Sequence, residues 1–84
     1  MQTQSSRPLQ VSLQILDLRQ ERCPMAMVKV KLALKQRQSG ESLQFLLSDP
    51  GSRRDVPRWL DKVGIPYERQ ECAAYLTLLV EAQS

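Results

Sequence analysis

The residues of this sequence best suited to covalent chemistry are its two cysteines. Cys23 is followed by Pro24 and by a stretch rich in helix formers, so we expect it at or beside the N-cap of a helix. Unpaired backbone N–H groups and the positive end of the helix dipole lie there, and both favour a thiolate over a thiol. Cys23 is therefore a candidate nucleophile, with Arg19 and Arg22 close enough in sequence to contribute positive charge. The alternative, equally open from the residues alone, is a small apolar residue that closes the core beneath the turn.

The residue types that are missing exclude several kinds of site. The sequence has no histidine, which removes Cys–His and Ser–His nucleophilic pairs and the commonest general base. The two cysteines form no CxxC pair, so a four-ligand zinc site is excluded, and we expect neither a metal nor an organic cofactor. We expect both thiols to be free, and we interpret Cys72 as a filler outside the site rather than a resolving cysteine.

The composition is that of one small globular domain. The chain has 84 residues, of which 42% are hydrophobic and 25% charged, and no apolar run is long enough to cross a bilayer. Its polar start lacks the apolar core of a secretion signal. We therefore expect a cytoplasmic protein with a polar tail over residues 1–8 and a single domain over residues 9–84.

Positive charge is concentrated around and after Cys23. The net charge is +3, but between residues 19 and 37 only Glu21 is acidic, against Arg19, Arg22, Lys29, Lys31, Lys35 and Arg37. Such a run is either the solvated face of a helix or a docking surface for an acidic partner or for RNA. Both interpretations stay open at this point.

The strand that precedes Cys23 is predicted from hydrophobic alternation. Apolar and polar residues alternate up to about Leu18, which is typical of a half-buried strand. The alternating apolar residues are Leu9, Val11, Leu13 and Ile15. Leu16 and Leu18 fall on the opposite face, which suggests a bulge or the end of regular pairing.

The first helix and the second strand follow. The helix is predicted from Pro24 to about Gln38, with Gly40 at its exit. Its inward face consists of Ala26, Val30, Ala33 and Leu34, with Met27 at the margin. The second strand has Leu43, Phe45 and Leu47 on one face and ends at the turn Asp49-Pro50-Gly51.

The rest of the chain predicts a second helix and two strands. We expect Ser52 to cap the helix, or a start nearer Asp55 because Pro57 is awkward inside a helix, and an end at Gly64. Its inward face consists of Val56, Trp59, Leu60 and Val63. Strands follow over about residues 67–72, polar enough for a sheet edge, and 75–81. The order βαβαββ predicts an α+β fold, a two-layer sandwich with a four-stranded mixed sheet and two helices on one face.

The stretch from Leu16 to Ala26 resembles the signature of the TusA/SirA-like family of sulfur-carrier proteins. In that family an Asp lies six residues before a Cys-Pro pair, as Asp17 lies before Cys23. The similarity covers about residues 13–81 and includes Gly40-Glu41-Ser42-Leu43, Asp49-Pro50-Gly51-Ser52, Asp55-Val56-Pro57 and Gly64. Several motifs at matching spacing make the resemblance much more specific than a Cys-Pro pair alone.

The resemblance implies a sulfur carrier with sulfurtransferase chemistry rather than a stand-alone enzyme. Cys23 would hold a persulfide, Pro24 would shape the helix entry, and Asp17 would brace the turn before it. Arg19 and Arg22 are assigned to the same turn from their proximity to Cys23 in the sequence, not from the resemblance. The donor would be a cysteine desulfurase or a rhodanese-type sulfurtransferase. The acceptor would serve tRNA thiolation, molybdenum-cofactor enzymes or sulfur oxidation.

The chain departs from the family pattern at two places. Ala26 stands where the family has a second proline, and Gln20-Glu21 stands where it has a Gly-Leu pair. Two alternatives to a sulfur carrier stay open. One is a regulatory or docking module in which Cys23 is unreactive, and the other is an RNA-binding domain that uses the basic first helix. For the sulfur carrier we expect no direct binding to nucleic acid or membrane.

A second apolar strip on the first helix is the candidate docking surface for a partner. Met25, Val28 and Leu32 lie opposite the inward face at spacings of three and four, and the strip begins two residues after Cys23. It is flanked by Lys29, Lys31 and Lys35, which suits an acidic partner. The alternative is that the strip is a buried seam covered by Val56 and Trp59 of the second helix.

Overall fold

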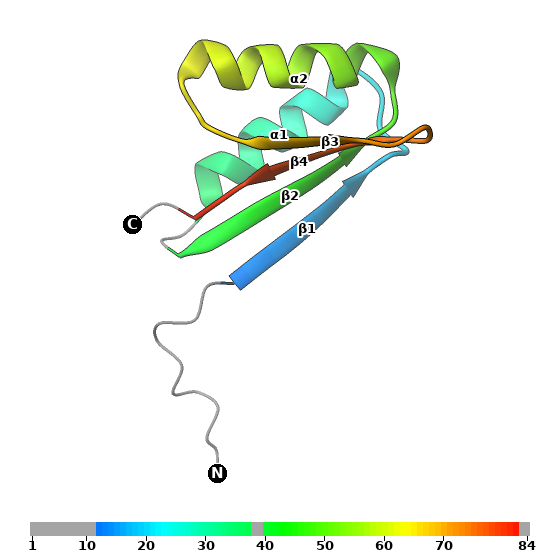
Figure 1. The fold of residues 1–84 in the computed structure, drawn as a ribbon. Helices are drawn as coiled ribbons and strands as arrows, with labels where there is room; N and C mark the ends of the chain where they lie inside the picture. Colours follow the sequence, from blue (N-terminus) through cyan, green and yellow to red (C-terminus); the bar gives the residue numbers. More distant parts are fainter. Residues whose placement is uncertain (1–11, 38–39, 83–84) are drawn as a thin grey trace.

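The computed structural model describes residues 12–37 and 40–82 and contains the six predicted elements in the predicted order (Figure 1). The elements are β1 Ser12–Leu18, α1 Met25–Gln36, β2 Glu41–Leu47, α2 Pro50–Val63, β3 Glu68–Glu71 and β4 Leu76–Val80. The predicted tail over residues 1–8, and Leu9 and Val11 of the predicted first strand, lie outside the described residues. None of the described helices is long and apolar enough to span a membrane.

The four strands form one mixed sheet in the order β1-β2-β4-β3. β1 pairs with β2 in parallel, and β4 is antiparallel to both β2 and β3. Both helices lie on the same face of this sheet, so the molecule has two layers (Figure 1). The predicted α+β two-layer sandwich with a four-stranded mixed sheet is confirmed.

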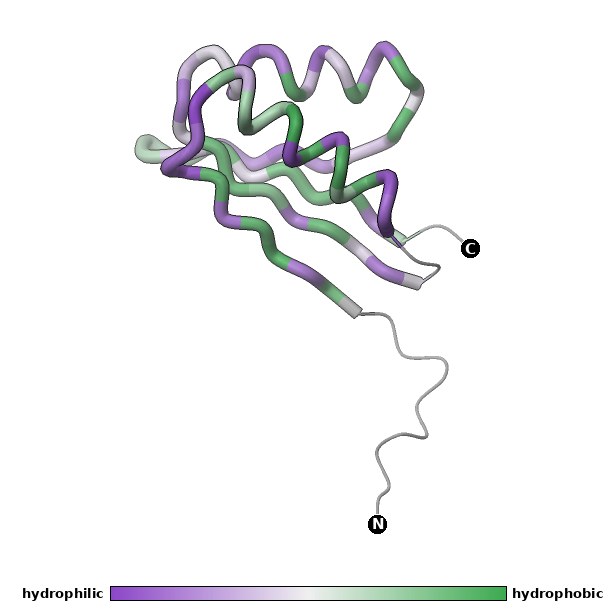
Figure 2. Tube along the Cα trace, turned by 180° about the vertical axis from the view of Figure 1, so that it is seen from behind, coloured by the Kyte–Doolittle hydropathy of each residue, from purple (hydrophilic) through white to green (hydrophobic). Residues whose placement is uncertain are grey.

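The core fills the space between the sheet and the helices. In the two central strands, β2 and β4, apolar side chains that point into the core alternate with side chains that point away from it. Figure 2 shows this as hydropathy that changes from residue to residue along the strands. The buried strand residues are Leu43, Phe45 and Leu47 of β2 and Leu76, Leu78 and Val80 of β4. From the helices, Ala26, Val30, Val56 and Leu60 are fully buried against them. Burial of each larger side chain contributes about 1.5–3 kcal/mol.

The face of β1 that we predicted to be buried is exposed. Its pairing with β2 is regular from Ser12↔Glu41 to Leu18↔Leu47, so neither the bulge nor the early end of regular pairing that Leu16 and Leu18 suggested occurs. Leu18 is buried, whereas Leu13 and Ile15 are more than half exposed. The reason is that both helices cover one face of the sheet, and Leu13 and Ile15 point to the face that they leave open.

α1 follows the prediction closely. Ala26 and Val30 are completely buried, and the other predicted inward residues pack against the core, namely Met27, Ala33 and Leu34. The helix is capped by Pro24 and ends at Gln36, so the predicted end at about Gln38 falls just beyond it, at a residue outside the described part of the chain. Gly40 turns the chain into β2 with a φ of 82°, which favours glycine.

α2 begins earlier than predicted. Its cap is Asp49, whose carboxylate accepts a hydrogen bond from the backbone N–H of Ser52, so the prediction of a Ser52 cap is wrong. Pro57 lies inside the helix and is buried there instead of delaying the helix start. Val63 is 47% exposed because the last turn, residues 61–64, projects beyond the core. Gly64 ends the helix in the left-handed conformation, as predicted.

β3 is the predicted edge strand. It lies at the end of the strand order and all four of its residues are exposed. A short turn then connects it to β4, within which the Cys72 N–H donates to the Tyr75 carbonyl at 2.9 Å. The turn lies at the end of the sheet where β1 and β2 finish. The loop that carries Cys23 lies at the same end.

Candidate functional site

Cys23 lies in the loop between β1 and α1, where the chain enters the helix. Its side chain is exposed and the thiol is free. The next residue, Pro24, is the N-cap of α1 and follows a cis peptide bond. The helical hydrogen bonds begin at once, because Ala26 N–H donates to Arg22 and Val28 N–H donates to Pro24, each at 3.0 Å. Cys23 is therefore next to the N-cap, as we predicted.

The N-terminus of α2 meets Cys23 as well. β1 and β2 are parallel neighbours, so the loops that follow them leave from the same edge of the sheet. A Cβ built on Gly51, in the first turn of α2, would lie 3.3 Å from the Cys23 Cβ and 3.9 Å from its Sγ. Only glycine leaves that space open. The thiol thus lies where two helix N-termini converge, and both favour negative charge.

Asp49 ties the two helix starts together. Its Oδ2 accepts hydrogen bonds from the N–H of Ser52 at 3.0 Å and from the N–H of Cys23 at 3.3 Å. The pKa of the Asp49 carboxyl lies below its usual value, chiefly because of the Ser52 N–H and with a smaller contribution from the Cys23 N–H, although desolvation opposes both. Asp49 is therefore a charged cap that fixes the backbone of the cysteine loop against α2.

The group that contacts the thiol itself is Asp55. Cys23 Sγ lies 3.9 Å from Asp55 Oδ2, within reach of a weak S–H···O hydrogen bond. The other carboxylate oxygen, Oδ1, accepts from Arg54 Nε at 3.1 Å. A thiol can donate to this carboxylate, whereas a thiolate or a persulfide anion would be repelled by it. The site thus combines two helix N-termini, which favour negative charge on the sulfur, with a carboxylate, which disfavours it.

Arg19, which we expected to supply positive charge, is paired with Asp17. Its Nε and Nη2 donate to the two carboxylate oxygens at 2.8 and 2.7 Å, and its backbone N–H donates to Oδ1 at 3.1 Å. This pair lowers the pKa of Asp17 to about 2 and raises the pKa of Arg19. The guanidinium also lies 5.2 Å from the Tyr75 ring centroid. Asp17 thus holds the residue that opens the turn towards Cys23, and Arg22 lies exposed in that turn.

The second apolar strip of α1 is on the surface. Met25, Val28 and Leu32 are each about half exposed, at 49%, 47% and 50%, so the alternative of a buried seam against α2 is wrong. The two helices meet elsewhere on α1, where the Lys31 ammonium lies 5.2 Å from the centroid of the Trp59 ring. The apolar strip therefore leads away from Cys23 along an open face.

The lysines beside this strip differ in their contacts. Lys29 Nζ forms an ion pair with Glu21 Oε2 at 2.6 Å. Glu21 belongs to the Gln20-Glu21 pair that differs from the family pattern, and this ion pair balances its charge. Lys31 is engaged by Trp59, whereas Lys35 is exposed near the end of α1. The basic run around Cys23 is thus partly neutralised within the chain.

Three residues of the site were not singled out from the sequence: Asp49, Gly51 and Asp55. All three lie at the start of α2, and only the parallel pairing of β1 with β2 brings them to Cys23. The signal that could have found them is the rule that loops after adjacent parallel strands meet at one edge of the sheet. Cys72, by contrast, is a free thiol on the surface, so it does not fill the core.

Comparisons with known proteins bear on the same residues. The family model described as Sulfurtransferase TusA matches residues 14–81. An Archaeoglobus fulgidus protein named "Putative sulfur carrier protein" is 37% identical over 51 residues, which are 61% of this chain and 58% of that protein. A Halobacterium salinarum protein, likewise named "Putative sulfur carrier protein", is 41% identical over 44 residues, 52% of this chain and 54% of that protein.

The chain thus spans less than two thirds of the length of these two relatives. The family model, however, matches nearly all of the described part of this chain, from β1 to β4. The match includes Asp17, Cys23 and the start of α2 with Asp49 and Asp55. The chain belongs to the TusA sulfurtransferase family.

Proposed function

We propose that the chain carries sulfane sulfur as a persulfide on Cys23 and passes it from a donor enzyme to an acceptor. The observation that carries this proposal is the free, exposed Cys23 thiol at the junction of two helix N-termini, within the region that matches the TusA family. A sulfur that must meet two different proteins in turn has to be accessible, and this one is. No imidazole is required, because the partners supply acid and base groups.

The transfer consists of two displacements at sulfur. In the first, the Cys23 thiolate attacks the outer sulfur of a donor cysteine persulfide. A bond forms between Cys23 Sγ and that sulfur, the donor S–S bond breaks, and the donor cysteine leaves as a thiolate. In the second, an acceptor nucleophile attacks the terminal sulfur of the Cys23 persulfide, and Cys23 leaves as a thiolate. Neither step needs an external oxidant or reductant.

The donor is of the cysteine desulfurase or rhodanese type, and the acceptor belongs to tRNA thiolation, molybdenum-cofactor or sulfur-oxidation chemistry. We place this exchange in the cytoplasm, where thiols stay reduced. The exposed strip Met25, Val28 and Leu32 is the proposed docking surface for one of these partners because it starts two residues from Cys23. We favour a sulfur carrier over RNA binding by α1, since Lys29 and Lys31 are already engaged within the chain.

Mass spectrometry after incubation with a cysteine desulfurase and cysteine tests the proposal. The protein should gain the mass of one sulfur atom, and a reducing thiol should remove it. Cys23→Ser should abolish the gain, whereas Cys72→Ser should retain it and serves as the matched control. Sulfur on Cys72 with none on Cys23 would refute the assignment, and no gain with any donor would favour an unreactive docking module.

A further inference from the structure

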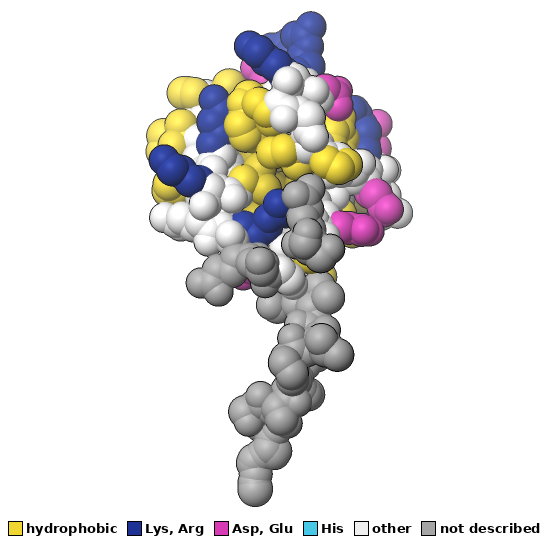
Figure 3. All heavy atoms as spheres, turned by 90° about the vertical axis from the view of Figure 1, so that its left-hand side faces the viewer, with side chains coloured by type: hydrophobic (Ala, Val, Ile, Leu, Met, Phe, Trp, Pro, Cys, Tyr) yellow, Lys and Arg dark blue, Asp and Glu magenta, His cyan; other side chains and the backbone are white. Residues whose placement is uncertain are grey.

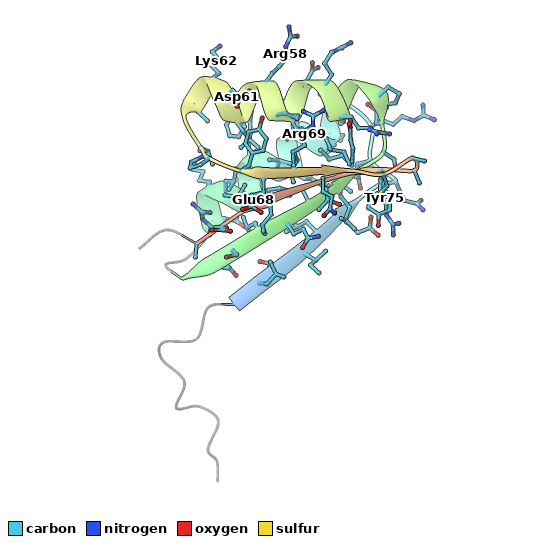
Figure 4. All side chains as sticks on the ribbon, viewed as in Figure 1. Arg58, Asp61, Lys62, Glu68, Arg69 and Tyr75 are labelled. Atoms are coloured by element: carbon cyan, nitrogen blue, oxygen red, sulfur yellow. The ribbon has the colours of Figure 1, made fainter. Side chains whose placement is uncertain are left out.

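A groove rich in arginine lies between α2 and the edge strand β3. Its volume is about 550 Å³ and the arginines that line it are Arg53, Arg54, Arg58 and Arg69. The acidic residues of the lining are Asp61 and Glu71, so positive charge is in excess. Figure 4 shows Arg69 extending from β3 towards α2. We refer to this feature as the arginine groove.

Two of these guanidinium groups are held side by side by one carboxylate. Glu71 Oε2 lies 3.3 Å from Arg69 Nη2 and 3.8 Å from Arg53 Nη2, so residues from a strand and a helix converge on it. All three side chains are partly exposed. Exposed ion pairs of this kind contribute little to stability. A carboxylate arriving from another molecule can therefore share or replace Glu71 at low cost.

The groove also opens onto an unpaired strand edge. β3 is the last strand in the sheet order, and among the described strands it pairs only with β4. Arg69 and Glu71 pair with the buried Leu78 and Leu76, so they face the helix layer. An extended segment that adds to this edge would place every second side chain under α2. The groove thus offers both backbone hydrogen bonds and arginines to one extended chain.

We infer that the arginine groove binds an extended, acidic segment of a partner protein, which adds to β3 and directs its carboxylates towards Arg53 and Arg69. RNA fits the groove less well. Tyr67 is only partly exposed, and burial together with the nearby Asp61 raises the pKa of its hydroxyl, so the ring is a poor platform for base stacking. Asp61 and Glu71 would in addition face the phosphates of a nucleic acid.

The position of the groove links it to Cys23. Pro50 lines the groove, and a Cβ on the next residue, Gly51, would lie 3.3 Å from the Cys23 Cβ, so the groove begins close to the reactive cysteine. A segment bound along the groove would reach the reactive sulfur from the α2 side, whereas the exposed strip of α1 reaches it from the other helix. The identity of the partner as a sulfur donor or acceptor rests on the proposed function. Binding in the groove does not require a reactive Cys23.

The test uses the full chain and a synthetic peptide of about eight residues that alternates glutamate with valine, a usual strand length. Binding of the labelled peptide is followed by fluorescence anisotropy and by backbone amide shifts in NMR. We expect the largest shifts at β3, residues 68–71. A peptide with lysine in place of glutamate should not bind. A glutamate peptide with a central proline should bind more weakly, because proline removes a ladder hydrogen bond.

Neutralising variants locate the site on the protein. The double variant Arg53→Gln, Arg69→Gln should weaken peptide binding about ten-fold or more, since charge-assisted hydrogen bonds are the stronger class. Lys62→Gln removes an exposed cation from the last turn of α2, outside the lining of the groove, and should change the affinity by less than about two-fold, as expected for a charge outside the interface. Melting curves of each variant show that the fold is retained.

Several results would overturn the inference. They are equal weakening by Lys62→Gln, amide shifts that avoid β3, and equal binding of the lysine peptide. Binding of a transfer RNA that is lost in the double variant, with no binding of the peptide, would assign the groove to nucleic acid instead. Cys23→Ser separates this inference from the sulfur-carrier proposal, because that variant should bind the peptide normally while taking up no sulfur.

Discussion

The carboxylate beside the thiol gives a quantitative test of the site. Asp55 Oδ2 lies 3.9 Å from Cys23 Sγ. Two unit charges at that separation repel each other by about 1 kcal/mol in water and by about 4 kcal/mol at an effective dielectric constant near 20. The Asp55 side chain is 36% exposed and Cys23 is exposed, so the lower figure applies. Asp55→Asn removes this repulsion and should therefore raise the rate at which the Cys23 sulfur attacks as an anion about five-fold.

The measurement is the rate of alkylation of Cys23 by iodoacetamide at neutral pH in the Cys72→Ser background. Asp55→Asn should raise this rate about five-fold, and iodoacetate, which carries a negative charge itself, should gain more. Added salt should reduce the difference between variant and parent. Asp61→Asn, on the same helix but without contact to the thiol, is the control. An unchanged or slower rate with iodoacetamide would refute the repulsion.

Three further predictions concern the neighbouring residues. Val28 is 47% exposed, so Val28→Glu should change the free energy of unfolding by less than about 0.5 kcal/mol yet block sulfur uptake from the donor. A sharp fall in melting temperature would end the proposal that this strip docks a partner. Gly51→Ala would place a Cβ 3.2 Å from Asp49 Oδ2 and 3.3 Å from the Cys23 Cβ, so sulfur uptake measured by mass spectrometry should slow several-fold; uptake at the parent rate would show that the close approach is unimportant. The pKa of Asp17 is depressed from 3.8 to about 2, so the Asp17–Arg19 ion pair should stabilise the fold above about pH 4 and lose this effect as the pH falls through 2. NMR titration of the Asp17 carboxyl carbon should show the low midpoint, and Arg19→Gln should return it towards 3.8.

The exposed apolar surface of the chain is not confined to α1. Leu13 and Ile15 lie on the open face of the sheet, and Figure 3 shows apolar side chains between lysines and arginines at the end of the molecule remote from the Cys23 loop. Exposed apolar residues alone therefore do not identify a docking surface. The position of Met25, Val28 and Leu32 beside the reactive cysteine is what distinguishes their strip.

Local sequence patterns determined most of the elements of this protein. The alternation of Leu43, Phe45 and Leu47 gives β2, and the helical spacing of Ala26 and Val30 gives the buried face of α1. Glycine at position 64 ends α2 because the left-handed conformation there costs it little. The position of Cys23 at a helix start follows from Pro24 and the helix formers after it. Each of these features depends on residues within one or two turns of the chain.

Tertiary structure decided which faces and which loops meet. Nothing local shows which face of the sheet the helices cover, so the alternation predicts that Leu13 and Ile15 lie on the buried face of a half-buried strand, although they face the open side. The parallel pairing of β1 with β2 brings Asp49 and Asp55 to Cys23 across 26 and 32 residues of sequence.

Charge partners were decided in the same way. The arginine that we placed beside the thiol is instead paired with Asp17, and Arg69 joins Arg53 only because β3 lies at the sheet edge next to α2. The spacing of apolar residues in the sequence shows which side of a helix or strand is apolar. Strand order and register determine what that side meets, and they arise from contacts between segments far apart in the chain.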